Sequence, residues 1–178
     1  MSMKNLFGAT AAALLLSAAS HSFAEGGYIG GQYAQTTYEQ TGTTLDGEAK
    51  PNSLILLGGY EFTDHWALEG RVGLGMGDDE YVTGTTLELD KLVSVLGKLS
   101  LGGTVSPYLL LGFSDIEVTT NNAGTAEANG VSYGAGVDFS VSENVSIGLE
   151  YISYVEEDGA GGGELNLSAV SLGVNYKF

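Results

Sequence analysis

Five charged residues stand inside stretches in which large apolar residues alternate with small ones. Each of them shares its parity with glycine, serine or alanine, and each lies a few residues from a short turn. An unpaired buried charge costs several kcal/mol, so a packed fold predicts that these side chains pair with one another. Their chemistry would be ionic: either a structural plug or a gated ion path. The five residues are Glu69, Arg71, Lys98, Asp138 and Glu150.

The residue types in the sequence give little support for catalysis or metal binding. The chain has no cysteine, which removes thiolate metal sites and disulfides. Once the first 24 residues are set aside, the only histidine is His65, beside Asp64 in a short polar turn. The acidic stretches "GDDE" (77–80) and "VEEDG" (155–159) lack calcium-loop spacing and are interpreted as solvated loops. We expect no enzyme activity, no resident metal and no cofactor.

Length and charge narrow the class of protein further. The 178 residues suit one domain. Residues 1–24, "MSMKNLFGATAAALLLSAASHSFA", have a lysine, a short apolar run and a small-residue cleavage flank, and are predicted to be a secretory signal peptide. The remaining chain has 5 basic and 22 acidic residues, a formal net charge of −17. So acidic a surface excludes nucleic acid as a partner.

The elements that must position the charges are strands. Connections between the alternating segments are in turn long and polar, then short, and the stretch 117–130 is interpreted as one of the long loops. This rhythm is typical of an all-β, eight-stranded antiparallel up-and-down transmembrane β-barrel, here predicted for residues 25–178, with both chain ends on the periplasmic side. The eight segments are 28–38, 53–62, 66–76, 86–101, 105–116, 131–141, 145–154 and 169–178.

The orientation of the strands follows from the small residues. A soluble barrel with a greasy interior would show the same alternation, with its polar parity facing water. Here that parity is mostly glycine, serine and alanine. These residues suit the crowded lumen of an eight-stranded barrel but make a poor solvated surface. We therefore expect the large apolar side chains to face lipid.

Aromatic residues mark one level of the predicted barrel. Each lies within a residue or two of a short turn or of the C-terminus. Amphipathic rings favour the headgroup region of a membrane, so these residues are predicted to form an aromatic girdle at the periplasmic interface. They are Phe62, Trp66, Phe139, Tyr176 and Phe178.

Lys91 departs from the pattern because it shares the parity of Val93 and Val95 on the lipid face. It lies about eleven residues from the turn at Gly102, roughly 28 Å along a tilted strand, whereas the apolar band is ~25 Å tall. Lys91 should therefore emerge at the outer headgroups. There it could bind a lipopolysaccharide phosphate, or it could be an ordinary solvated lysine.

Taken together, these features resemble the small outer-membrane barrels, namely the transmembrane domain of outer membrane protein A and related adhesin-like barrels. The resemblance spans residues 25–178 and includes "LGGYEF" (57–62), "GKLS" (97–100), "GVDF" (136–139), "GLEY" (148–151) and the final "SLGVNYKF" (171–178). It implies the outer membrane of a Gram-negative bacterium, with outer-membrane lipid and lipopolysaccharide as surroundings. It also implies that the last strand, ending in Tyr176 and Phe178, is the signal presented to the barrel insertion machinery.

The resemblance also suggests how the lumen charges pair. It implies that Lys98 pairs with Asp138 or Glu69, and that Arg71 pairs with Glu69 or Glu150. Two arginines of the family pattern are absent, because Leu110 and Gly148 stand at those positions, and this leaves the partner of Glu69 open.

The function expected on these grounds is a structural and surface-interaction barrel. Its lumen would be closed by side chains, and it would present acidic loops to the exterior. A narrow ion-conducting pore gated by interior salt bridges is the alternative, and an adhesin is a third. Because larger family members carry a peptidoglycan-binding domain after the barrel, and this chain ends at Phe178, no such domain is expected. The barrel is expected to be monomeric.

Overall fold

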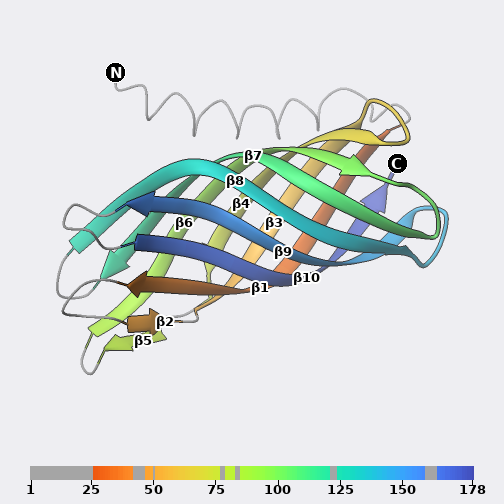
Figure 1. The fold of residues 1–178 in the computed structure, drawn as a ribbon. Coiled ribbons are helices and arrows are strands. Elements are labelled where there is room, and N and C mark those ends of the chain that lie inside the picture. Colours follow the sequence, from red (N-terminus) through yellow and green to blue (C-terminus); the bar gives the residue numbers. More distant parts are fainter. Residues whose placement is uncertain are drawn as a thin grey trace, which may run out of the picture.

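The protein is a closed antiparallel β-barrel (Figure 1). The computed structural model describes residues 26–41, 47–49, 51–76, 79–82, 85–120, 124–158 and 164–178; the predicted signal peptide, residues 1–24, lies outside them. Eight strands form the barrel, and the pairing of β1 with β10 closes it, which confirms the predicted eight-stranded up-and-down fold. They are β1 (Gly27–Thr41), β3 (Asn52–Glu61), β4 (Trp66–Gly75), β6 (Thr85–Ser100), β7 (Val105–Thr120), β8 (Gly124–Ser140), β9 (Val145–Asp158) and β10 (Glu164–Lys177).

Two short strands extend the wall at one end. β2 (Gly47–Ala49) pairs with β1, and β5 (Asp79–Val82) pairs with β6. We call this end of the barrel the hairpin end. The opposite end, which carries the three short connections and the C-terminus, is the turn end (Figure 1). The described residues form no helix that is long and apolar enough to cross a membrane.

Alternation sorts the side chains of every strand between the two faces of the wall. In β3, Leu54 and Leu56 are exposed on the outer surface, whereas Ser53, Ile55 and Leu57 are buried. Successive strand residues point to opposite faces, so the same division runs around the barrel. The outer surface therefore carries a broad band of exposed large apolar side chains, far beyond the patch size expected on a water-soluble monomer, although Val93 of β6, on the same parity, is buried.

The short turns at the turn end are built from local hydrogen bonds. The backbone N–H of Trp66 donates to Thr63 Oγ1 over 3.1 Å, and that of Val145 donates to Ser142 Oγ over 3.1 Å. The first and third turns therefore share one hydroxyl-capped design. The second turn uses Gly102 and Gly103, whose φ angles of 73° and 95° are accessible to glycine at little cost.

The strands extend farther than the alternation predicted. The stretch 117–130, which we interpreted as a loop, is mostly strand, because β7 continues to Thr120 and β8 begins at Gly124. The interpretation was wrong for a physical reason. Beyond the apolar band, outward-facing side chains of both strands can be polar. The backbone ladder therefore continues, although the hydrophobic alternation disappears.

The interior is also more apolar than the small-residue parity suggested. Large apolar side chains also lie on the inner face and are buried, so the description of the inner parity as mostly small residues was incomplete. We call this set the apolar layer. Its main members are Ile55, Leu92, Leu96, Leu110, Ile116, Ile152, Tyr154 and Leu167, all buried.

Candidate functional site

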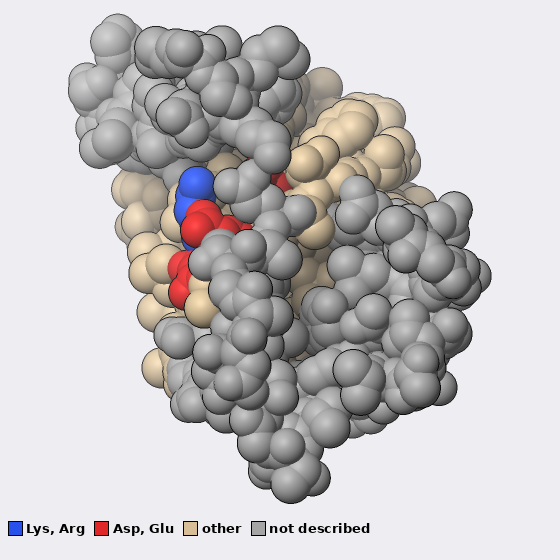
Figure 2. Space-filling model, turned by 90° about the vertical axis from the view of Figure 1, so that its left-hand side faces the viewer, with Lys and Arg blue, Asp and Glu red and all other residues tan. Residues whose placement is uncertain are grey.

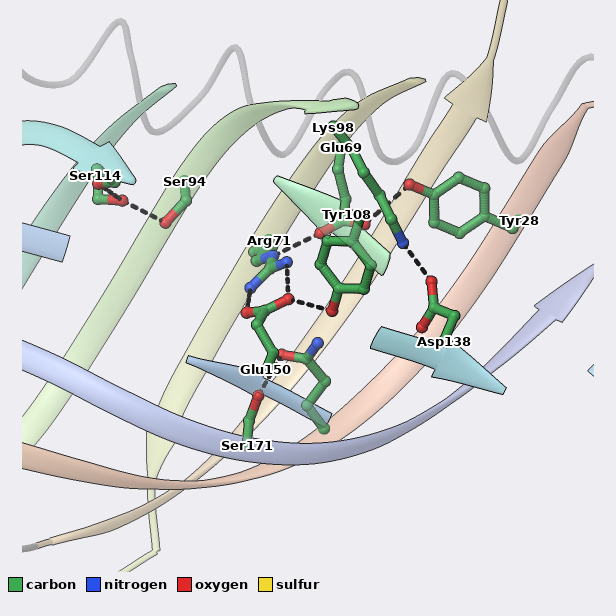
Figure 3. Close-up of polar contacts among 12 residues, drawn as sticks. Tyr28, Glu69, Arg71, Ser94, Lys98, Tyr108, Ser114, Asp138, Glu150 and Ser171 are labelled. Atoms are coloured by element: carbon green, nitrogen blue, oxygen red, sulfur yellow. Dashed lines mark hydrogen bonds and ion pairs between the residues drawn. The ribbon is translucent and has the colours of Figure 1, made fainter. Parts of the chain in front are cut away.

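The centre of the lumen holds one arginine between two glutamates (Figure 3). Glu69 and Arg71 are two residues apart in β4 and point to the same face, and Glu150 reaches them from β9. Arg71 Nε lies 2.5 Å from Glu69 Oε1, while Nη1 and Nη2 donate to the two Glu150 oxygens at 2.5 and 2.8 Å. All three residues are at most 2% exposed. The guanidinium fork thus holds both carboxylates in fixed positions.

Two tyrosines complete the hydrogen bonds of these carboxylates. Tyr28 of β1 donates its hydroxyl to Glu69 Oε2 over 2.8 Å, and Tyr108 of β7 donates to Glu150 Oε2 over 2.8 Å. Buried carboxylates are tolerated when their lone pairs are satisfied. The network therefore links β1, β4, β7 and β9 across the lumen (Figure 3).

A second ion pair lies on the turn-end side of the network. Lys98 Nζ is 2.7 Å from Asp138 Oδ2, and both side chains are largely buried. The ammonium also lies 4.0 Å from the centroid of the Tyr108 ring and 5.8 Å from that of Tyr28. Cation–π attraction therefore couples this pair to the two tyrosines that serve the glutamates.

Glycines on neighbouring strands make room for the two tyrosines. Tyr28 stands opposite Gly59, and Tyr108 stands opposite Gly136. A Cβ added at Gly59 would lie 2.3 Å from the Tyr28 ring, and one at Gly136 would lie 2.4 Å from the Tyr108 ring. The small residues on the inner face thus leave space for a few large side chains from neighbouring strands.

Hydroxyl groups form a further belt among the buried inner residues. Ser94 and Ser114 lie 2.7 Å apart, Ser114 and Ser132 lie 2.6 Å apart, and Ser132 donates to the backbone carbonyl of Tyr154 over 2.7 Å. Beside this belt lies the apolar layer. The register places part of this layer beside the charged residues, since Leu96 stands opposite Glu69 and Leu110 stands opposite Lys98.

A cavity opens at the turn end. Its volume is about 520 Å³, and Lys98 and Asp138 belong to its wall. His65 lines the rim of this cavity and is exposed. Lys177 forms an ion pair with Glu61 at the same rim. The described residues contain no cluster of three or more histidine, cysteine, aspartate or glutamate side chains that could bind a metal ion.

The predicted girdle residues all lie at the turn end with exposed side chains. Phe62 and Trp66 flank the first turn and are 63% and 56% exposed, and Tyr176 and Phe178 stack edge to face with ring centroids 5.3 Å apart. Phe139 lies near the third turn, 44% exposed. The placement is that of a ring of aromatic side chains around one rim; its role as an insertion signal stays a prediction.

Lys91 is the one predicted site residue at the hairpin end. It lies on the outer face of β6, directly opposite Glu117 of β7. The register therefore gives this lysine a carboxylate of its own chain as a cross-strand neighbour. Contact with a lipopolysaccharide phosphate stays a prediction.

Two residues of the network were missed in the sequence. Tyr28 and Tyr108 share their parity with glycine, serine and glutamine rather than with the large apolar residues. A tyrosine on the small parity was the available signal, since its bulk needs a facing glycine and its hydroxyl needs an acceptor. The partner of Glu69, left open above, is both Arg71 and Tyr28.

The chain matches the model of a known protein family. The family model described as "Outer membrane protein beta-barrel domain" matches residues 7–178. No curated protein sequence matches the chain.

Several solved structures share the fold. Neisserial surface protein A is 19% identical, with a TM-score of 0.67 over 86% of this chain and 98% of that one. The outer membrane protein OprG of Pseudomonas aeruginosa is 16% identical, with a TM-score of 0.56 over 86% and 96%. Ail, the attachment invasion locus protein of Yersinia pestis, solved with the heparin analogue sucrose octasulfate, is 22% identical, with a TM-score of 0.55 over 86% and 100%.

The match to the family model covers almost the whole chain, and the structure is a closed barrel. The chain therefore belongs to the outer membrane protein beta-barrel domain family and is a protein of the Gram-negative outer membrane.

Proposed function

We propose that this protein is a non-conducting wall element of the outer membrane that presents an acidic rim to the cell exterior. The observation that supports the proposal is the buried network inside the barrel. Arg71 holds Glu69 and Glu150 across the lumen, and buried apolar side chains lie on the same inner face. A hydrated ion crossing the lumen would have to break this network.

The cavity at the turn end supports this view rather than a pore. Its lining residues lie near the turn end and include Lys98 and Asp138, but not Arg71, Glu69 or Glu150. Eight-stranded barrels have an interior that side chains just fill. Opening the Lys98–Asp138 pair alone would leave Arg71, Glu69 and Glu150 in place beyond it.

The rim at the hairpin end supports the surface role. Residues 36–52, 77–91, 114–130 and 152–168 contain 15 acidic residues and 2 lysines, a formal net charge of −13. Figure 2 views the molecule from this end and shows coloured acidic side chains beside a basic one. Such a field attracts cationic partners and repels polyanions. Ail was solved with the polyanionic heparin analogue sucrose octasulfate. The acidic rim of this chain favours a cationic partner instead.

Conductance across a planar bilayer tests the proposal. We expect the refolded barrel to give no discrete conductance steps, and Lys98→Ala to stay equally silent because the Arg71 network remains. Lys177→Ala is the matched control, since it removes an ion pair at the rim and leaves the lumen untouched. Steps in the unaltered protein, or steps that appear in Lys98→Ala but not in Lys177→Ala, would establish the gated pore instead.

A further inference from the structure

The outer face of the barrel can be compared strand by strand at equal height. The three turns, 62–65, 101–104 and 141–144, each contain four residues, and β10 and β1 meet at the same end, where the N–H of Phe178 donates to the carbonyl of Gly27 over 3.0 Å. The number of residues between an outer side chain and the last strand residue at the turn end therefore measures its height. Each residue adds roughly 2.5 Å, from a rise of ~3.3 Å and a tilt of ~40°.

Strands on opposite sides of the barrel differ at the same height. In the closed ring of eight strands, β1 lies across from β7, and β3 lies across from β8 (Figure 1). Eight residues from the turn end, β1 has the exposed Gln35, whereas β7 has Phe113, 64% exposed. Nine residues from the turn end, β3 has Asn52, whereas β8 has Val131, 51% exposed. Two polar residues thus lie across the barrel from two exposed apolar ones.

The other two pairs of opposite strands complete the comparison. Eight residues from the turn end, β9 has Ser153, which is buried, and β4 has Leu74, which is exposed. Nine residues from the turn end, β10 has Ser168 and β6 has Lys91, so this pair is polar on both sides. All four strands β9, β10, β1 and β3 are therefore polar at this height. We call these strands the short half of the barrel, and β4, β6, β7 and β8 the tall half.

Polar residues of the short half form one continuous patch on the outer face. Gln35 stands opposite Asn52, and Thr37, the next outer residue of β1, stands opposite Ser168. We call these four residues the polar arc. Gln35 is exposed and the other three are partly exposed. Gln35 and Asn52 lie roughly 20–22 Å from the turn end, inside an apolar band that is typically ~25 Å tall. Amide and hydroxyl groups need hydrogen-bonding surroundings, which hydrocarbon does not supply.

Tyrosines just below this level provide a second, independent observation. Tyr33 of β1 and Tyr151 of β9 are exposed on the outer face, each six residues from the turn end. At the same distance, the strands across the barrel have Leu111 on β7 and Val72 on β4. Tyrosine is enriched where hydrocarbon meets headgroups. From the hairpin end downward, the short half thus has uncharged polar, then aromatic, then aliphatic side chains, which is the order found across a membrane interface.

We propose that the polar arc is a contact surface for the lipid headgroups of the leaflet at the hairpin end. Headgroups and their water reach Gln35 and Asn52 on the short half, while acyl chains cover Phe113 and Val131 at the same height on the tall half. The apolar face is shorter by about two residues on the short half, so the membrane surface is lower there by roughly 5 Å. Bilayers accommodate a mismatch of this kind at modest cost.

Depth measurements on single cysteines test the proposal. The chain has no cysteine, so each variant has one thiol, which receives a nitroxide before the chain is refolded into phosphatidylcholine vesicles. Collisions of the nitroxide with oxygen, which concentrates in hydrocarbon, are compared with collisions with a water-soluble nickel chelate present on both sides of the membrane. We expect the chelate to dominate in Gln35→Cys and Asn52→Cys, and oxygen to dominate in Phe113→Cys and Val131→Cys.

Two positions in the middle of the band serve as matched controls. Leu172→Cys on the short half and Leu109→Cys on the tall half lie five and four residues from the turn end, and both native side chains are exposed. Oxygen should dominate at both, which shows that lipid covers each half below the arc. Thr37→Cys and Ser168→Cys replace the first two variants if either of those fails to fold.

Vesicles with shorter acyl chains provide a second measurement on the same proteins. The nitroxides at positions 113 and 131 should then collide more with the chelate, while those at 35 and 52 change little because headgroups already surround them. The proposal is overturned if all four positions give the same ratio of collisions while the two controls favour oxygen. It is also overturned if the chelate loses access to positions 35 and 52 as the protein-to-lipid ratio rises, because a second copy of the chain would then be covering the arc.

Discussion

Arg71 is the residue on which the interior depends. Its guanidinium binds Glu69 and Glu150 at once, and no described side chain other than Tyr28 and Tyr108 donates to those two carboxylates. Replacing a whole buried ionic group with apolar residues can be nearly neutral, whereas removing one partner leaves an uncompensated charge. Loss of Arg71 would therefore be costly because it would leave the carboxylates of Glu69 and Glu150 without their cation.

Arg71→Ala is predicted to destabilise the folded barrel by about 3–5 kcal/mol, because it leaves two glutamates buried with no cation. Urea unfolding in lipid vesicles, followed by the fluorescence of the single tryptophan, measures this free energy. The triple change Glu69→Leu, Arg71→Met and Glu150→Leu should recover most of the loss. If Arg71→Ala unfolds at the same urea concentration as the unaltered protein, the network does not support the fold.

Gly136 illustrates how a residue without a side chain can determine packing. It stands opposite Tyr108 in the neighbouring strand. An added Cβ would lie 2.4 Å from the tyrosine ring and 2.8 Å from the backbone carbonyl of Leu149. The ring cannot withdraw without losing its bond to Glu150, and the carbonyl belongs to the wall.

Gly136→Ala is therefore predicted to destabilise the barrel by about 1–3 kcal/mol, the usual range for overpacking. Gly31→Ala is the matched control on the outer face, where the nearest atom to a new Cβ is in the Leu56 side chain at 3.9 Å. Urea midpoints of the two variants, measured side by side, check the comparison. Equal midpoints would show that the tyrosine does not need the glycine.

At the scale of the strands, alternation was informative only where lipid and lumen differ. From Ser53 to Leu57 in β3, residues are alternately buried and exposed, and this part of the pattern could be read directly. In β7 beyond Phe113, the outer positions are Asp115, Glu117 and Thr119. Both faces there tolerate polar residues, so the sequence contains no periodic signal although the backbone pairing continues.

The lumen shows a second limit of the same kind. The charged residues were recognisable because a charge on the inner parity is chemically conspicuous. Leu92 and Leu96 lie on the same parity of β6 as Ser94 and Lys98, yet an apolar residue on an inner position looks like any other strand residue. Only the closed barrel reveals that such residues from different strands meet and form a layer.

The possible partners of Arg71 could likewise be narrowed to two from the sequence, but the choice between them could not be made. Glu69 and Glu150 were both candidate partners, and the structure uses both. The choice depends on the distance across the lumen, which in turn depends on the stagger of the strands around the barrel. That stagger is a property of all eight pairings together and is not encoded in any one of them.

For the whole molecule, the dominant feature is the uneven distribution of charge between the two ends. In the sequence, the four stretches 36–52, 77–91, 114–130 and 152–168, which include the strand ends at the hairpin end, have a formal net charge of −13, while the turn end has a few acidic residues, of which Glu61 is paired with Lys177. The field of a rim of this kind falls off within a Debye length of ~8 Å at physiological ionic strength. Partners are therefore selected by charge only at contact, and selection weakens as salt is added.

This asymmetry predicts selective binding by the barrel in neutral lipid vesicles. We expect retention on immobilised polylysine at low ionic strength, loss of retention as salt rises, and no retention on immobilised heparin at any salt. Changing Glu156, Glu157 and Asp158 together to glutamine and asparagine should lower the salt concentration needed for release, because it removes three charges from the rim. The same kind of neutralisation at the turn end, Asp64→Asn with Glu143→Gln, is the control. If both sets shift release equally, or if heparin retains the barrel, the rim does not govern its contacts and the proposed surface role fails.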